Sequence, residues 1–207
     1  GDPQHATALL AELIPHYNRT LGPDHPTTLL ARHNHALSVK EAGDPQHATA
    51  LLAELIPHYN RTLGPDHPTT LLARHNHALS VKEAGDPQHA TALFTELIYD
   101  CARALGADHL NTLNARHNHA LSVREAGNPH HATALFTELI PHGALTLGPD
   151  HPTTLLARHN HAVSVSEAGD PQHATALLDK LIYDCTRTLG PDHPTTRRSR
   201  EYRDRYL

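Results

Sequence analysis

The sequence contains no tryptophan and no methionine, and its 207 residues include only two phenylalanines and two cysteines. It has no apolar run near the ~20 residues that a membrane-spanning helix needs, so we expect no membrane segment. No signal peptide opens the chain either, and it begins at Gly1, so we interpret it as a fragment, a processed protein or a design. Lysine and arginine number 17 against 22 acidic residues, for a net charge of −5. That balance argues against nucleic acid as a partner, because nucleic acid requires a basic surface.

The scarcity of cysteine excludes a disulfide framework. Cys101 and Cys185 lie 84 residues apart, which is two lengths of the repeat described below. Packed helices are spaced about 8–10 Å apart, so these residues should exceed the ~7 Å separation of Cα atoms that a disulfide allows. We therefore predict free thiols, which are usual in the cytoplasm.

Signals for catalysis are missing as well. No phosphate-binding glycine loop and no nucleophile elbow occur, and the glycines stand only where helices should end. A repeating wall also offers the same groups several times, whereas catalysis needs one convergent cavity. We therefore expect neither an enzyme nor a cofactor.

A repeat of 42 residues fills most of the chain. Residues 1–42 and 43–84 are identical, and the same pattern continues through 85–126, 127–168 and 169–196. A period of this length is typical of a solenoid, in which each unit buries its apolar face against its neighbours. We predict a single array over residues 1–207, made of these five units and a polar capping helix at about 193–207.

Each unit should contain two helices. In "AGDP" at 42–45, Gly43 fits a left-handed helix end, Asp44 an N-cap and Pro45 the first helical position. In "LGPDHP" at 63–68, Gly64 should end the first helix, and Asp66 should begin the second. Between these signals, apolar residues recur at spacings of three and four: Ala48, Leu51, Leu52, Leu55, Ile56 and Tyr59.

Prolines interrupt this first helix in some units. Pro15, Pro57 and Pro141 lie inside it, whereas Tyr99 and Tyr183 take the same place in the other two units. Proline removes a backbone hydrogen bond and clashes with the preceding turn of a helix. We therefore expect a kink or an early end in the three units with proline.

The repeat resembles the tetratricopeptide repeat of the kinesin-light-chain class. Ala36, Val39 and Ala48 have the spacing of the family's small, aromatic and small positions, and the turn falls at Gly43. The long linker and the 42-residue period are similar to that class, which also occurs in sensor regions of bacterial signalling ATPases. The resemblance covers about residues 1–196. It implies an all-α fold, namely a right-handed α-solenoid of antiparallel helix pairs forming a superhelix.

Histidine is the abundant residue, with 22 copies. The stretch "ARHNHALSV" at 31–39 returns almost unchanged at 73–81, 115–123 and 157–165. His33 and His35 should point about 200° apart on a helix, so they cannot chelate one ion, and we predict no metal site. The family places apolar core residues at the second histidine, so we expect half-buried imidazoles, hydrogen-bonded to a neighbouring helix, at His35, His77, His119 and His161. Acid should loosen the array by protonating these rings.

The resemblance also implies a binding surface on the concave face. Related domains hold a peptide backbone there with asparagine amides, which offer both donors and an acceptor. The candidate asparagines are Asn34, Asn76, Asn118 and Asn160. Beside them we place His33, His75, His117 and His159, then Leu37, Leu79, Leu121 and Val163, and the cations Lys40, Lys82 and Arg124. The alternative is that the asparagines serve contacts between helices. A clamp for a C-terminal carboxylate is not expected, because Leu30, Leu72, Asn114 and Leu156 stand where such clamps carry lysine.

We therefore predict a scaffold that binds a protein or peptide ligand. One alternative is a structural protein that stacks end to end, because Leu9, Leu10, Leu13 and Ile14 of the first helix lack a preceding partner helix. Another is a histidine-rich module that responds to pH or to metal. The last helix carries Arg197, Arg198, Arg200, Arg203 and Arg205, which predicts either a solubilising cap or a basic docking helix.

Overall fold

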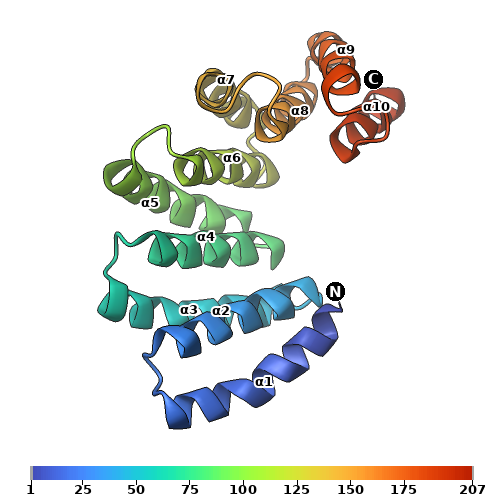
Figure 1. Cartoon of the computed structure of the whole chain (residues 1–207). Coiled ribbons are helices and arrows are strands. Elements are labelled where there is room, and N and C mark those ends of the chain that lie inside the picture. The colour runs from blue at the N-terminus through green and yellow to red at the C-terminus, as the bar shows by residue number, and fades with distance from the viewer. Residues whose placement is uncertain (1, 207) are drawn as a thin grey trace. The chain divides into compact units, whose positions relative to one another are not determined.

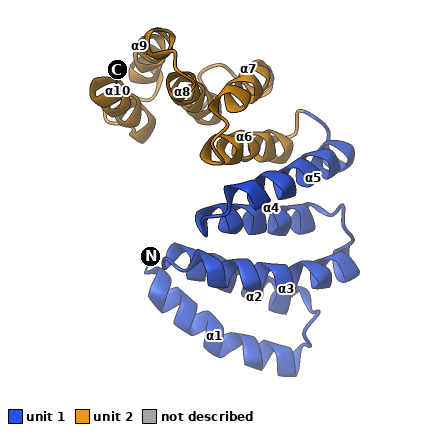
Figure 2. Cartoon of the chain, turned by 180° about the vertical axis from the view of Figure 1, so that it is seen from behind, with its two compact units in different colours: residues 1–107 blue, residues 108–207 orange. Residues whose placement is uncertain are grey.

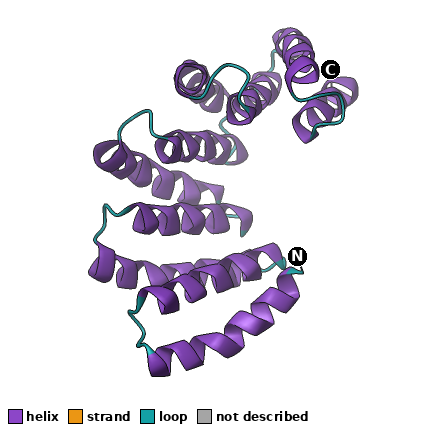
Figure 3. Cartoon of the chain, in the orientation of Figure 1, coloured by secondary structure: helices purple, strands orange, loops and turns teal. Residues whose placement is uncertain are grey.

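The computed structural model describes residues 2–206, which form ten helices and no strand (Figures 1 and 3). Gly1 and Leu207, the ends of the predicted array, lie outside the described residues. The partner helices, which fill the first half of each repeat, are α1 (Pro3–Thr20), α3 (Pro45–Leu63), α5 (Pro87–Leu105), α7 (Pro129–Thr146) and α9 (Pro171–Thr188). The motif helices, which fill the second half, are α2 (Pro26–Glu41), α4 (Pro68–Glu83), α6 (Leu110–Glu125), α8 (Pro152–Glu167) and α10 (Pro194–Tyr206).

The chain divides into two compact units, residues 1–107 and 108–207 (Figure 2). Within each unit every helix packs against the next one along the chain, from α1 to α5 and from α6 to α10. Motif helices also contact the next motif helix, α2 with α4, α6 with α8, and α8 with α10. This arrangement confirms the predicted all-α solenoid of helix pairs.

Most of the predicted start and stop signals are confirmed. Gly43 has a φ of 96°, and the carboxylate of Asp44 accepts a hydrogen bond from the backbone N–H of His47 at 3.0 Å. The predicted N-cap of the motif helices is wrong. In α4 the N-cap is His67 and not Asp66. Since Pro68 occupies the first helical position, the residue before it becomes the cap, and its Nδ1 accepts from the N–H of Thr69 at 3.2 Å.

We predicted a kink or an early end in the three partner helices with proline, and none of them ends early. The helices that contain Pro15, Pro57 and Pro141 have 18, 19 and 18 residues, and those with tyrosine at that place have 19 and 18. The three proline rings are exposed, so the carbonyl that loses its helical donor can bind water instead.

The core forms where a partner helix lies between two motif helices. In unit 1, Leu55 and Tyr59 of α3 cluster with Leu29 of α2 and Ala73 of α4, and the Tyr59 hydroxyl donates to the Leu29 carbonyl at 3.2 Å. The equivalents of Tyr59 in later repeats are Cys101, Gly143 and Cys185. Both cysteines are buried and free, as predicted. No described helix is long and apolar enough to cross a membrane.

Candidate ligand-binding surface

The first histidine of each motif belongs to the core rather than to an open wall. His33, His117 and His159 are only 3–7% exposed, and His75 is half-buried. Each ring meets an aromatic neighbour edge-on, at centroid distances of 5.4–6.3 Å: His33 with Tyr59, His75 with Phe94, His117 with Phe136, and His159 with Tyr202. These rings therefore offer little surface to a ligand.

Asparagines of the motif hydrogen-bond to these histidines across neighbouring repeats. Nδ2 of Asn76 on α4 lies 3.0 Å from Nε2 of His33 on α2. Nδ2 of Asn160 on α8 lies 3.2 Å from Nε2 of His117 on α6. We call each such contact a rung. Through these rungs, Asn76 and Asn160 make a contact between helices, which was the predicted alternative to ligand binding.

The last motif helix is joined in a similar way. Nδ1 of His159 lies 3.0 Å from the hydroxyl of Ser199 on α10. At the other end Asn34 on α2 is exposed, and its side chain makes no hydrogen bond with another described residue.

Burial favours the neutral form of the first motif histidine in three of the repeats. It lowers the pKa of His33, and it lowers the pKa of His75 to about 4, with a further contribution from Lys40. The pKa of His159 is also about 4, first because of burial and then because of the charges of Arg198 and Arg124. Because Nε2 of His33 accepts from the Asn76 amide, the proton of the neutral ring lies on Nδ1, which is buried without a hydrogen-bond partner among the described residues.

The second histidine of each motif is half-buried, as the resemblance implied: His35, His77, His119 and His161. Burial lowers the pKa of each ring, and a histidine on the following partner helix lowers it further. Nε2 of His161 lies 3.2 Å from the hydroxyl of Thr137 on α7. The ring of His161 thus lies between a motif helix and a partner helix. Among the described residues, no group of three or more potential ligands could hold a metal ion.

In unit 2 the predicted surface residues gather around a groove of about 420 Å³. It lies between α6 and α8, with Arg198 of α10 at its edge. Five predicted residues line it: His117, Asn118, Leu121, Arg124 and Asn160. The groove also contains residues outside the predicted peptide-binding set: Asn114, Glu125, Thr153, Leu156 and Arg198.

Several polar groups around the groove are already engaged. Nδ2 of Asn118 donates to the carbonyl of Asn114 at 3.1 Å, and Nε of Arg124 lies 3.6 Å from a carboxylate oxygen of Glu167. Arg198 is exposed and makes no ion pair with another described residue. The repeat register could have identified Arg198 as a residue of this surface, because it lies one period of 42 residues after Leu156, which lines the same groove.

The predicted surface residues of unit 1 show the same arrangement. Lys40 lies 3.6 Å from Glu83 of the next repeat, and Lys82 is half-buried. Leu37, Leu79 and, in unit 2, Leu121 are half-buried, whereas Val163 is buried. Lys40 and Arg124 therefore form ion pairs across repeats, a contact that was not predicted from the sequence.

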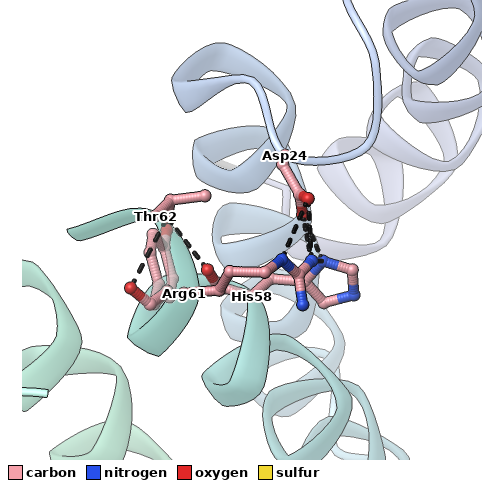
Figure 4. A network of polar contacts seen from close by, with 5 residues as sticks. Asp24, His58, Arg61 and Thr62 are labelled. Carbon is pink, nitrogen blue, oxygen red and sulfur yellow. Dashed lines mark hydrogen bonds and ion pairs between the residues drawn. The ribbon is translucent and has the colours of Figure 1, made fainter. Parts of the chain in front are cut away.

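A separate polar network fixes the linker in front of a motif helix (Figure 4). Asp24 accepts hydrogen bonds from Arg61 at 2.6 and 2.7 Å and contacts the ring of His58, both on α3. The pKa of the Asp24 carboxyl is held below its usual value, mainly by the hydrogen bond from Arg61 and then by the one from His58. Asp66 pairs with Arg103, and Asp150 with Arg187, in the same way. The linker acids therefore serve to join repeats.

The tetratricopeptide repeat family model matches residues 28–69 and 154–195. Two crystal structures of a protein from Podosopora anserina, described as a kinesin light chain with nearly identical TPR-like repeats, are 27% identical to this chain. The alignments cover 91% of this chain and 89% of that one, with TM-scores of 0.80 and 0.78. BtubC (BKLC) from P. vanneervenii shares the fold at 12% identity and a TM-score of 0.72, over 100% of this chain and 91% of its own. No curated protein matches the sequence.

Proposed function

We propose that this chain, which matches the tetratricopeptide repeat model over residues 28–69 and 154–195 and is similar to a kinesin light chain repeat structure, is a non-catalytic scaffold that holds an extended peptide segment against its motif helices. The family fold generally serves protein interactions. The observation that carries the proposal is the groove of about 420 Å³ between α6 and α8. Free buried thiols at Cys101 and Cys185 fit a cytoplasmic setting.

The groove combines the groups that an extended peptide needs. Leu121 and Leu156 supply apolar surface, and amides of Asn114 and Asn118 lie beside them. The rung on Asn160 uses Nδ2, so its Oδ1 remains to accept from a peptide N–H. Arg198 adds a cation at the edge, where an acidic side chain of the partner can pair with it.

End-to-end stacking, the alternative function, has less support. On α1, Leu9 and Leu13 are 47% and 42% exposed, whereas Leu55 of the identical helix α3 is buried under Leu29. A second copy could cover α1 with its α10, but there Arg197 occupies the place of Leu29. Burying an unpaired guanidinium against leucine is unfavourable, so the two ends do not fit each other.

The test is binding of peptides selected from a random library on the intact protein. In the double variant Asn114→Leu/Arg198→Leu, both residues become leucine, which the other repeats carry at the same position of the motif helix. The variant should therefore fold normally. We expect it to bind the selected peptides roughly tenfold more weakly, a loss of about 1.4 kcal/mol. Substituting Asn160 would be less informative, because it also breaks a rung.

The matched control is Leu72→Asn, which makes the reverse change at the equivalent position in unit 1. It should leave the affinity unchanged. Peptides that bind the groove variant as tightly as the original protein would refute the proposed surface.

A further inference from the structure

One position on the partner helices reverses its charge in the last repeat. Glu12, Glu54, Glu96 and Glu138 occupy this place in the first four repeats, and Lys180 occupies it in α9. In an array with nearly identical units, such a change alters the surface locally without altering the fold.

Lys180 borders a second groove, which we call the Lys180 groove. It has a volume of about 270 Å³ and lies entirely in unit 2, between α7, α8 and α9. Its apolar part is made by Ile140, Pro141 and Leu177. Its polar part is made by Thr137, Arg158, His161 and Lys180. None of these residues lines the groove between α6 and α8.

Lys180 supplies the one uncompensated charge of this groove among the described residues. Arg158 pairs with Asp184 at 2.7 Å, and the neighbouring Asp179 pairs with Arg203 of α10 at 2.8 Å. His161 is half-buried beside Thr137, and burial followed by His173 lowers its pKa, so the ring is neutral near pH 7. Lys180 is exposed, and its side-chain ammonium has no hydrogen bond or ion pair with another described residue.

We propose that the Lys180 groove binds a small apolar carboxylate. The half-buried side chains of Ile140 and Leu177 receive the apolar part, and the ammonium of Lys180 pairs with the carboxylate. Thr137 and His161, whose hydroxyl and Nε2 lie 3.2 Å apart, line the same groove. The volume is just under the roughly 300–1,000 Å³ of sites for drug-sized ligands, which selects a smaller molecule. This inference does not depend on the proposed peptide surface.

The test uses octanoate as the probe and octan-1-ol, which has the same chain length without the charge, as the matched ligand. Titration of the whole protein, followed by amide chemical shifts, should show saturable binding of octanoate with shifts at Ile140 and Leu177. Lys180→Glu restores the residue of the other repeats, so the fold is retained. It should weaken octanoate binding about five- to tenfold, as expected for the loss of one partly screened ion pair.

The control for net charge is Arg19→Glu, which makes the same charge change on an exposed residue of α1 in unit 1. It should bind octanoate like the original protein. The inference is overturned if octan-1-ol binds as tightly as octanoate, if Lys180→Glu leaves the affinity unchanged, or if octanoate does not bind saturably.

Discussion

At the scale of single residues, the buried histidine is the unusual choice of this array. A ring such as His117 contacts an aromatic edge on one side and hydrogen-bonds to an asparagine of the next repeat on the other. An imidazole can accept from the amide only while it is neutral, because both ring nitrogens are donors once it is charged, and a charged ring in the core would also lose its hydration. The same contacts that hold repeats together therefore make them sensitive to acid.

Stability should fall as the pH drops below 6.5. The pKa of His75 and of His159 is about 4 in the folded chain, against the ordinary value of 6.5. Between these values the unfolded chain binds more protons, so acid favours unfolding, by roughly 3 kcal/mol per ring over the whole interval. Urea unfolding at a series of pH values measures the slope.

The variant His159→Gln keeps a polar side chain that does not titrate, so its stability should vary less steeply with pH. His5→Gln, at an exposed position, is the control and should leave the slope unchanged. Equal slopes for His159→Gln and the original protein would contradict this account.

A glycine inside α7 gives a second prediction at this scale. Gly143 stands where Tyr59 and the two cysteines pack in other repeats, and a small apolar cavity lies beside it. A Cβ atom there would lie 3.4 Å from the hydroxyl of Thr154, so Gly143→Ala fits. Because alanine is the better helix former, the variant should raise the free energy of unfolding by about 1 kcal/mol in urea titrations.

Gly148→Ala is the matched control. Its φ of 104° suits glycine alone, so the same substitution should destabilise the protein there. If both variants change the free energy of unfolding in the same direction, helix propensity and backbone strain do not account for the effects of substituting Gly143 and Gly148.

At the scale of helices, the partner helices show how packing overrides a local breaker. The helix α3 continues through Pro57 to Leu63 because its apolar face is buried against α2 and α4. The lost hydrogen bond remains a local cost, since the proline is exposed and packs little.

Replacing Pro57 with tyrosine should therefore stabilise the protein. Tyr99 occupies the equivalent place in α5 and is 70% exposed, so a tyrosine side chain fits there without a clash. Restoring the backbone N–H should raise the free energy of unfolding by about 1–3 kcal/mol, measured by urea unfolding. The reverse substitution, Tyr99→Pro, should lower it; a Pro57→Tyr variant that is less stable than the original would show that proline helps instead, by restricting the unfolded chain.

Helices and their ends could be predicted from the sequence because their signals are local. Gly43, Asp44 and Pro45 specify a helix boundary whatever surrounds them. The rungs could not be predicted, because a contact between His33 and Asn76 depends on how two motif helices cross. The place of Arg198 in the groove was missed for a related reason, since the arginines of α10 suggested a cap or a docking helix of its own rather than the edge of an existing surface.

At the scale of the whole molecule, the first and last helices expose different surfaces. The helix α1 packs against α2 alone among the described helices, and it exposes Leu13, whose counterpart Leu55 in the identical α3 is buried. The helix α10 exposes Arg197 and Asp204 at the positions of Leu29 and Ala36. One end is therefore apolar and the other charged.

We predict that the protein does not form linear polymers. Analytical ultracentrifugation over a wide concentration range should show nothing larger than a dimer, formed through the α1 face. Leu13→Glu places a charge on that face and should leave only monomer. A series of growing oligomers would show that the charged end accepts α1 after all.

The spacing of the rungs has a consequence for how such a chain can change length. Asn76 follows His33 by 43 residues, and Asn160 follows His117 by 43, one more than the repeat itself. Duplicating or deleting a whole unit therefore regenerates every donor and acceptor in place, with no new partner to be selected. Gene rearrangements in multiples of this module therefore preserve the rungs, whereas an insertion of another length inside a motif helix would move an imidazole or an amide away from its partner.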